Sequence, residues 1–199
     1  MIRTACRLFA LLLVAATSAG AARQADVSIT IDGRIGPLQL DRSTARSIVA
    51  FAGRPDAVPW SRFASQYAAY TALGYSCRPT DIGWRFALTP AYKGPFCKTV
   101  FYVNRRTGRL ADFETSSRQY VGPRGLRVGM QSAIAERRLH QHLRQACGAN
   151  VGFTTRRADL TLEFVGGSMR PDQSVVGAHL ADMVLTSLRH DVGVYALLC

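Results

Sequence analysis

The chain has 199 residues and a formal net charge of +12, with 25 lysines and arginines against 13 aspartates and glutamates. Lys93 and Lys98 are its only lysines, so the positive excess is almost all arginine. Net charge excludes no fold, but it favours an acidic partner such as lipid headgroups, acidic polysaccharide or an acidic protein; a composition bias that merely keeps the chain soluble explains the charge equally well.

The first residues have the pattern of a secretory signal. Arg3 and Arg7 precede an apolar run over residues 8–16, and small residues follow as far as Ala21. The run is shorter than the ~20 apolar residues that span a bilayer, which argues against a membrane anchor. We therefore predict a signal peptide over residues 1–21 and a mature chain that is secreted or periplasmic. Nucleic acid is not expected as a partner in that compartment.

Export gives the cysteines a structural meaning. Cys6 leaves with the signal, and four cysteines remain: Cys77, Cys97, Cys147 and Cys199. An even number in an exported chain indicates disulfides, and four cysteines allow three pairings. Each half of the chain holds two, which favours Cys77 with Cys97 and Cys147 with Cys199. A metal site is the alternative, but no two of these residues form the close C-x-x-C pair typical of zinc ligands.

The segment after the signal predicts two short strands and a helix. Residues 27–31 alternate apolar and polar side chains, as a half-buried strand does, and residues 38–40 alternate again after a turn. Apolar residues then recur at helical spacing over residues 45–52. Asp41 or Ser43 can cap this helix by accepting backbone N–H bonds, and a glycine and a proline soon after it mark its end.

A second helix is predicted where four aromatic residues keep helical spacing: Trp60, Phe63, Tyr67 and Tyr70. Because aromatic residues at this spacing mostly supply core area, we expect a buried stripe packed on the first helix. An aromatic binding platform is the alternative. Residues 73–77 and 84–88 then read as short strands in a region broken by prolines and glycine.

The clearest local signal is a hairpin. Residues 97–103 and 109–115 are rich in β-branched and aromatic side chains, and the turn between them contains Asn104 and Gly108. Alternate residues point to opposite faces, so we expect one face to meet helices and the other to be only half covered. Residues 116–123 are polar and form the boundary to the second half.

The second half begins with a predicted strand over residues 126–128. Apolar side chains in one continuous seam then predict a helix over residues 135–147 that stops at Gly148. Three further strands are predicted at residues 160–164, 177–185 and 192–198.

Two stretches of the chain, residues 36–45 and 125–133, look like copies of each other, because their apolar and hydroxyl positions coincide at one constant offset. Each copy reads as a short strand, a polar turn and the start of a helix. We therefore predict an α+β fold of two tandem repeats, residues 22–121 and residues 122–199. Each repeat is expected to be a helix pair packed on an antiparallel sheet.

No motif for catalysis, cofactor binding or metal binding is found in the sequence. His140 and His142 are two residues apart and point nearly opposite ways on a helix, so they cannot share an ion. His179 and His190 have no partner at recognisable ligand spacing. Neither a G-x-S-x-G nucleophile turn nor a Gly-rich phosphate loop occurs. We assign no catalytic residue, no cofactor and no metal.

The second copy resembles a known pattern. Residues 125–133, Gly-Leu-Arg-Val-Gly-Met-Gln-Ser-Ala, are similar to the start of the tandem-repeat units of the β-lactamase inhibitor protein and of small outer-membrane assembly lipoproteins related to it in fold. The resemblance implies a short strand and a Gly-Met turn that lead into a helix pair and an antiparallel sheet. In the first copy Asp41 and Arg42 replace Gly and Met, and we interpret both pairs as turn and packing residues. Residues 53–56 match the usual end of the first helix.

The resemblance implies a fold and no activity. No matching motif carries over the inhibitor's binding residues. From residue 115 through the second repeat the chain also resembles uncharacterised exported bacterial proteins, a likeness that implies no function.

The leading functional hypothesis is an exported, non-enzymatic binding or inhibitor-like module that presents a basic and aromatic sheet surface. Arginine and aromatic side chains are enriched at interfaces, and the candidate surface is formed by Lys98, Tyr102, Arg105, Arg156 and Arg157. The expected partner is an acidic protein or an envelope component. The alternatives are an envelope hydrolase with an unrecognised active site and a structural envelope protein attracted by charge alone.

Overall fold

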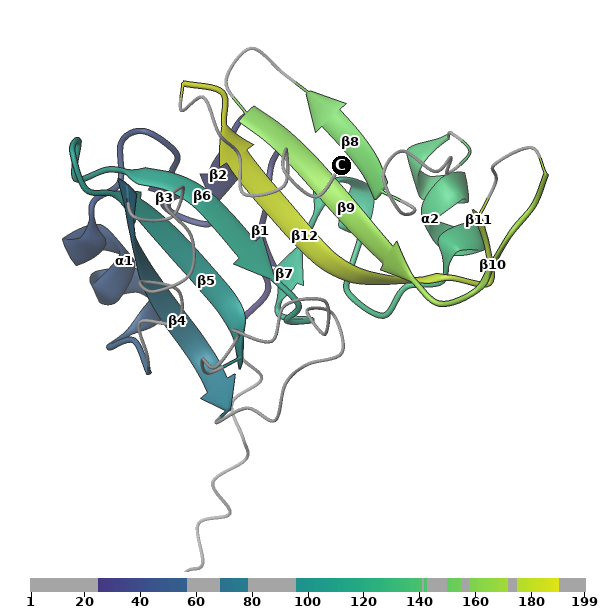
Figure 1. The fold of residues 1–199 in the computed structure, drawn as a ribbon, viewed down its shortest axis with the longest axis horizontal. Coiled ribbons are helices and arrows are strands. Elements are labelled where there is room, and N and C mark those ends of the chain that lie inside the picture. The colour runs from purple at the N-terminus through teal and green to yellow at the C-terminus, as the bar shows by residue number, and fades with distance from the viewer. Residues whose placement is uncertain are drawn as a thin grey trace, which may run out of the picture.

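The computed structural model describes residues 25–56, 69–78, 96–140, 142, 150–154, 158–171 and 175–189. Its main feature is one six-stranded antiparallel sheet with the strand order β4-β5-β6-β12-β9-β8 (Figure 1). The strands are β4 (Tyr70–Arg78), β5 (Phe96–Asn104), β6 (Leu110–Thr115), β8 (Asn150–Thr154), β9 (Ala158–Val165) and β12 (His179–Ser187).

The centre of the sheet joins strands that are far apart in the chain. β6 and β12 are antiparallel neighbours, with Thr115 opposite Met183 and Asp112 opposite Thr186. β5 and β4 therefore follow β6 on one side of this pair, and β9 and β8 follow β12 on the other. The two halves of the chain form one continuous sheet.

This arrangement shows that the predicted fold class is wrong. We predicted two tandem α+β repeats, each with a helix pair on its own antiparallel sheet. The described residues contain two α-helices, α1 (Ala45–Ala52) and α2 (Ser132–Leu139), one in each half. The repeated strand–turn–helix pattern specifies only local structure. In two separate repeats, β6 and β12 would each be an edge strand with unpaired backbone groups, and pairing the two strands satisfies these groups. The boundary between residues 121 and 122 stays a prediction.

Helix α1 begins and ends where its sequence pattern predicts. Thr44, and neither Asp41 nor Ser43, is the N-cap: its Oγ1 accepts the N–H of Ser47 at 3.3 Å, and the Ser47 hydroxyl accepts the N–H of Thr44 at 3.4 Å. Gly53 ends the helix, and its N–H donates to the Val49 carbonyl. The predicted second helix of this half falls mainly outside the described residues, although Tyr70 begins β4 instead.

Helix α2 is shorter than predicted. It ends at Leu139, because His140 has left-handed backbone dihedrals (φ 55°) and its N–H closes the last turn on Glu136. A residue from outside the helix also satisfies its final carbonyls, since Arg124 Nη1 donates to the carbonyls of Arg138 and Leu139. The predicted seam beyond this point lies mostly outside the described residues.

Short elements complete the fold. β1 (Val27–Ser28) runs parallel to β7 (Tyr120–Val121), and β2 (Arg34–Ile35) pairs with β3 (Leu38–Gln39). β10 (Ser168–Met169) pairs with β11 (Val175–Val176), and η3 (Pro123–Gly125) is a single 3-10 turn. Residues 126–128 form no strand, contrary to the sequence-based expectation, although Leu126 is fully buried.

One face of the sheet carries the main core. Phe101 and Phe113 are fully buried, lie opposite each other on β5 and β6, and have ring centroids 4.9 Å apart. This face packs against the helices and the N-terminal segment, whose buried members include Ile29, Ile48 and Ala135. Burying such side chains stabilises the fold by roughly 1.5–3 kcal/mol each. No helix in the described part of the chain has both the length and the apolar character needed to cross a bilayer.

Candidate functional site

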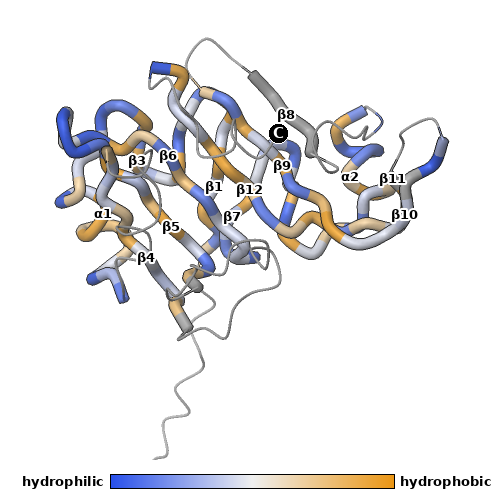
Figure 2. Tube along the Cα trace, in the orientation of Figure 1, coloured by the Kyte–Doolittle hydropathy of each residue, from blue (hydrophilic) through white to orange (hydrophobic). Residues whose placement is uncertain are grey.

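Five exposed arginines gather at one end of the sheet. They come from three segments: the loop before α1, the turn between β5 and β6, and the residues that follow β12. We call this group the arginine end, and its members are Arg42, Arg105, Arg106, Arg109 and Arg189. Figure 2 shows hydrophilic colour at the β5–β6 turn and just beyond β12.

Hydrogen bonds to the side chain and backbone of Asn104 and to the Ala69 carbonyl fix the β5–β6 turn. Asn104 Oδ1 accepts the N–H groups of Arg106 and Thr107, each at 3.0 Å. Gly108, whose backbone φ is 66°, donates its N–H to the Asn104 carbonyl at 2.8 Å. Arg105 donates its N–H to the Ala69 carbonyl at 2.8 Å. The turn therefore holds three arginines at fixed backbone positions.

The loop before α1 is tied to the first residue of β6. Asp41 donates its N–H to the Leu110 carbonyl, and Leu110 donates its N–H to the Ser43 carbonyl, both at 2.8 Å. Arg109 Nη1 donates to the Arg42 carbonyl at 2.7 Å. These bonds bring Arg42 beside the β5–β6 turn.

Asp41 itself has left-handed backbone dihedrals, with a φ of 61°. In the sequence alignment of the two similar stretches its counterpart is Gly129, whose φ is 88°. The two turns make the same kind of bond, because Gly129 donates its N–H to the Leu180 carbonyl at 2.7 Å. A non-glycine residue in this region costs about 1 kcal/mol or more, so the first turn keeps a carboxylate at the expense of backbone strain.

The carboxylate of Asp41 has a specific partner. Ser187, the last residue of β12, donates its hydroxyl to Asp41 Oδ2 at 2.6 Å, and the same hydroxyl accepts the N–H of Arg189 at 3.2 Å. One buried serine thus fixes both the loop that carries Arg42 and the backbone of Arg189.

A small pocket lies where these segments meet. Its volume is about 110 Å³, and it is lined by Asp32, Gln39, Leu40, Asp41, Arg42 and Arg189. The guanidinium groups of Arg42, Arg105, Arg106 and Arg189 form no ion pair with any carboxylate in the part of the chain that the structure describes.

A buried carboxyl group on β6 lies close enough to Asp41 for their charges to interact. Asp112 on β6 is 0 % exposed, and neither of its oxygens has a hydrogen-bond partner of good geometry among the described residues. The pKa of Asp112 is raised to about 7: burial is the largest cause, the Thr186 side chain opposite acts in the other direction, and the nearby charge of Asp41 adds a smaller increase. Burial, and then the charge of Asp112, also raise the pKa of Tyr70.

These groups do not form an accessible acid–base site. Asp112 and Ser187 are fully buried, so neither can touch a substrate in this conformation. Within the described ranges, no cluster of three or more histidine, cysteine, aspartate or glutamate side chains is placed to hold a metal ion. The arrangement is suited to holding an anion at the exposed arginines.

The structure does not bring the predicted surface residues together. Lys98 and Arg105 are both exposed, but Lys98 lies near the start of β5 and Arg105 follows its end. Tyr102 lies between them, is only 1 % exposed, and donates its hydroxyl to Glu114 Oε2 at 3.2 Å. Arg156 and Arg157 lie outside the described residues.

The second face of the sheet also has buried side chains, and Tyr102 is one of them. It belongs to a smaller apolar cluster with Tyr70, Ala72, Val100 and Ala111. The expectation that this face is only half covered is therefore wrong around Tyr102.

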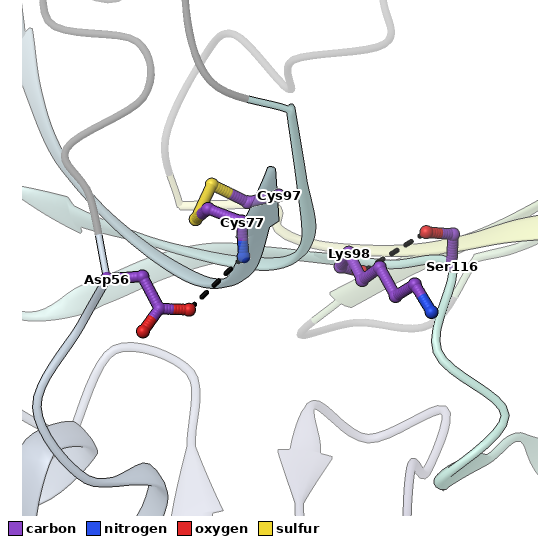
Figure 3. The surroundings of a disulfide bond; sticks show 5 residues. All are labelled: Asp56, Cys77, Cys97, Lys98 and Ser116. Carbon is purple, nitrogen blue, oxygen red and sulfur yellow. Dashed lines mark hydrogen bonds between the residues drawn. A yellow bond between two sulfur atoms is a disulfide. The ribbon is translucent and has the colours of Figure 1, made fainter. Parts of the chain in front are cut away.

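One of the two expected disulfides is confirmed. Cys77 and Cys97 are opposite each other on β4 and β5, and their sulfur atoms are 2.04 Å apart (Figure 3). Asp56 Oδ2 accepts the N–H of Cys77 at 3.1 Å beside the bond. Cys147 and Cys199 lie outside the described residues, so their pairing stays a prediction.

Sequence reasoning missed Arg42, Arg189 and the buried Asp112. A signal was present for the first of these, because Asp41 and Arg42 depart from the Gly-Met pair of the second copy. No sequence pattern links residue 42 to residue 189, which line one pocket and are connected by the hydrogen bond between Asp41 and Ser187.

Comparison with known proteins does not assign the chain to a family. No protein-family model matches the chain, and no curated protein matches it. Among solved structures it is similar to the uncharacterized protein yfeY from Escherichia coli, with a TM-score of 0.41 and 11% identity, over 81% of this chain and 99% of that one. It is also similar to an extracellular protein containing a SCP domain from Bacillus anthracis str. Ames, with a TM-score of 0.35 and 9% identity, over 72% of this chain and 43% of that one. At these scores we draw no conclusion from either likeness.

Proposed function

We propose that the protein is an exported, non-enzymatic binding module that holds an anionic partner at the arginine end. The observation that carries this proposal is the convergence of Arg42, Arg105, Arg106, Arg109 and Arg189 from three segments of the chain. Arginine presents five donors in a planar fork that matches carboxylate and phosphate groups. A partner bearing several such groups gains from each arginine that it meets.

The rigidity of this end supports the proposal. The arginines lie on a hydrogen-bonded turn, a loop anchored to Leu110, and a backbone position held by Ser187. Because these positions are already ordered, binding loses less conformational entropy than it would on a flexible tail. Ordered arginine positions therefore favour specific binding of one partner over non-specific attraction of any anion.

The binding surface that we propose differs from the one expected from the sequence. Arg105 remains in it, Tyr102 leaves it because its ring is buried, and Lys98 lies at the other end of β5. The surface is therefore basic but not aromatic. No observation in the described residues favours the envelope hydrolase.

Retention on immobilised heparin, a soluble polyanion, tests the proposal. We expect the double variant Arg105→Gln/Arg106→Gln to elute at clearly lower salt than the parent protein, because two contact charges are lost. The matched control is Arg54→Gln/Arg170→Gln, which removes the same charge from two exposed positions away from this end. Equal shifts for the two variants would mean that net charge alone causes the retention, and the proposal would be wrong.

A further inference from the structure

We propose that the pocket at the arginine end holds the phosphodiester group of an anionic lipid headgroup, and that Ile31 and Leu188 enter the lipid surface beside it. This inference rests on the proposed function, since it assigns the anion that the same arginines would meet. It goes further by naming the charged group, its place and the source of that group.

The size of the pocket limits what it can take. Its volume is about 110 Å³, whereas pockets that enclose a whole small molecule measure roughly 300–1,000 Å³. A space of this size accommodates several water molecules or one tetrahedral oxyanion. The pocket therefore fits a single charged group at the end of a larger molecule.

Two arginines supply the donors. Arg42 and Arg189 line the pocket from different segments. Their backbones are fixed, because Arg42 donates its N–H to the Gln39 carbonyl at 3.3 Å and Arg189 donates its N–H to the Ser187 hydroxyl at 3.2 Å. Arginine–phosphate hydrogen bonds are charge-assisted and often bidentate, so two arginines at one small pocket are suited to a phosphate group.

Two carboxylates line the same pocket and influence which charge on the ligand is preferred. Asp32 accepts a hydrogen bond from the Thr30 hydroxyl and lies 3.6 Å from the Arg34 guanidinium. Asp41 accepts the hydroxyl of Ser187. Because two carboxylates line the pocket together with Arg42 and Arg189, a doubly charged phosphomonoester is repelled more than a singly charged phosphodiester.

Exposed aliphatic side chains identify the source as a lipid surface. Ile31 is 42% exposed and Leu188 is 44% exposed, two of the four large apolar side chains exposed among the described residues. Each is the chain neighbour of a pocket residue, Ile31 of Asp32 and Leu188 of Arg189. Apolar side chains among arginines are the combination that binds the interface of an anionic membrane, where both insertion and charge contribute.

Vesicle co-sedimentation tests the inference with three lipid compositions. The vesicles consist of phosphatidylcholine alone, phosphatidylcholine with phosphatidylglycerol, and phosphatidylcholine with phosphatidic acid at matched surface charge. We expect binding to the phosphatidylglycerol vesicles, weaker binding to the phosphatidic acid vesicles and little to the neutral ones. Equal affinity for phosphatidylglycerol and phosphatidic acid would overturn the preference for a phosphodiester.

Paired variants locate the site. Arg42→Gln/Arg189→Gln should reduce affinity for phosphatidylglycerol vesicles by roughly tenfold or more, since two charge-assisted contacts are lost. Arg54→Gln/Arg170→Gln, with the same loss of charge, should reduce it much less. If both variants lose affinity equally, the pocket is not the site. Circular dichroism and thermal unfolding confirm that each variant is folded.

A soluble phosphodiester distinguishes binding of the headgroup alone from binding of the lipid surface. Glycerophosphoglycerol, the deacylated headgroup, should shift the amide NMR signals of Arg42 and Arg189 in a saturable manner. Ile31→Ser/Leu188→Ser should keep these shifts and lose vesicle binding. Saturable binding of the soluble diester without vesicle binding would overturn the lipid assignment. Heparin retention that depends on Arg105 and Arg106, without vesicle binding or diester binding, would overturn this inference and leave the proposed function standing. If heparin retention does not depend on these arginines and neither vesicles nor the diester bind, the inference and the proposed function are both wrong.

Discussion

The hydroxyl of Ser187 donates a 2.6 Å hydrogen bond to Asp41 Oδ2, and this bond joins the loop before α1 to the end of β12. The two residues are 146 positions apart in the chain. Ser187 is fully buried, and its hydroxyl also accepts the N–H of Arg189. The bond therefore helps to fix where Arg42 and Arg189 lie relative to each other.

Replacing Ser187 with alanine should destabilise the fold. The variant leaves a largely buried carboxylate without one of its donors, and a hydrogen bond to a charged group contributes about 1.5–3 kcal/mol. Urea unfolding followed by circular dichroism measures the change. Ser116→Ala is the matched control, because the Ser116 hydroxyl makes an exposed 3.3 Å bond to the Lys98 carbonyl. If both serine variants are equally stable, the bond between Ser187 and Asp41 contributes nothing measurable.

Backbone strain at Asp41 predicts an order among its variants. Asp41→Gly and Asp41→Ala both lose the carboxylate, but only glycine takes a φ of 61° without cost. The glycine variant should therefore be more stable than the alanine variant by about 1 kcal/mol. Equal unfolding free energies for the two would show that the left-handed conformation is not kept in the variants. Asp41→Asn keeps an acceptor for Ser187 and should be the most stable of the three.

The buried Asp112 should make stability depend on pH. Its pKa is raised from 3.8 to about 7 in the folded state, so between these values the folded protein binds more protons than the unfolded chain. The contribution of this group to the free energy of unfolding is therefore greatest below about pH 4. It decreases by up to about 4 kcal/mol as the pH rises through about 7. Denaturant unfolding at a series of pH values measures this change.

The variant Asp112→Asn isolates that contribution, because it keeps the shape of the side chain and cannot ionise. Relative to the parent protein, it should gain stability as the pH rises from about 4 to about 8. A difference between the two proteins that does not change with pH would contradict a raised pKa for Asp112.

The disulfide between Cys77 and Cys97 should stabilise the fold. It closes a loop with a sequence separation of 20, for which the chain-entropy model gives about 3 kcal/mol. Cys77→Ala/Cys97→Ala should therefore unfold at lower urea under oxidising conditions. Adding a reductant should lower the stability of the parent protein by more than that of the variant. If reductant affects both equally, this bond is not a stabilising one.

Local patterns in the sequence predicted local structure well. Helix α1 agrees with its predicted range because its apolar spacing and its glycine stop act within a few residues, although its cap is Thr44 and not Asp41 or Ser43. The hairpin of β5 and β6 and the alternation in β9 were predicted for the same reason. In each case the residues that specify the element are close together in the chain.

Non-local contacts account for the errors. Helix α2 ends early at a left-handed His140, and Arg124 satisfies carbonyls of its last turn from outside the helix. The pairing of β6 with β12 depends on residues that no periodic pattern relates. Tyr102 has the residue type of a binding surface, but a second apolar cluster buries it. The arginine end was predicted only through Arg105, because Arg42 and Arg189 meet it in three dimensions.

The position of β12 makes the assembly of the sheet depend on chain order. Each of its two neighbours, β6 and β9, precedes it in the sequence, so during synthesis both exist before the strand that must enter between them. Until residues 179–187 emerge, the edges of β6 and β9 have unpaired backbone groups and are open to pairing with other chains. Closing the sheet is then a long-range step, which is expected to make folding slow relative to the formation of the hairpins.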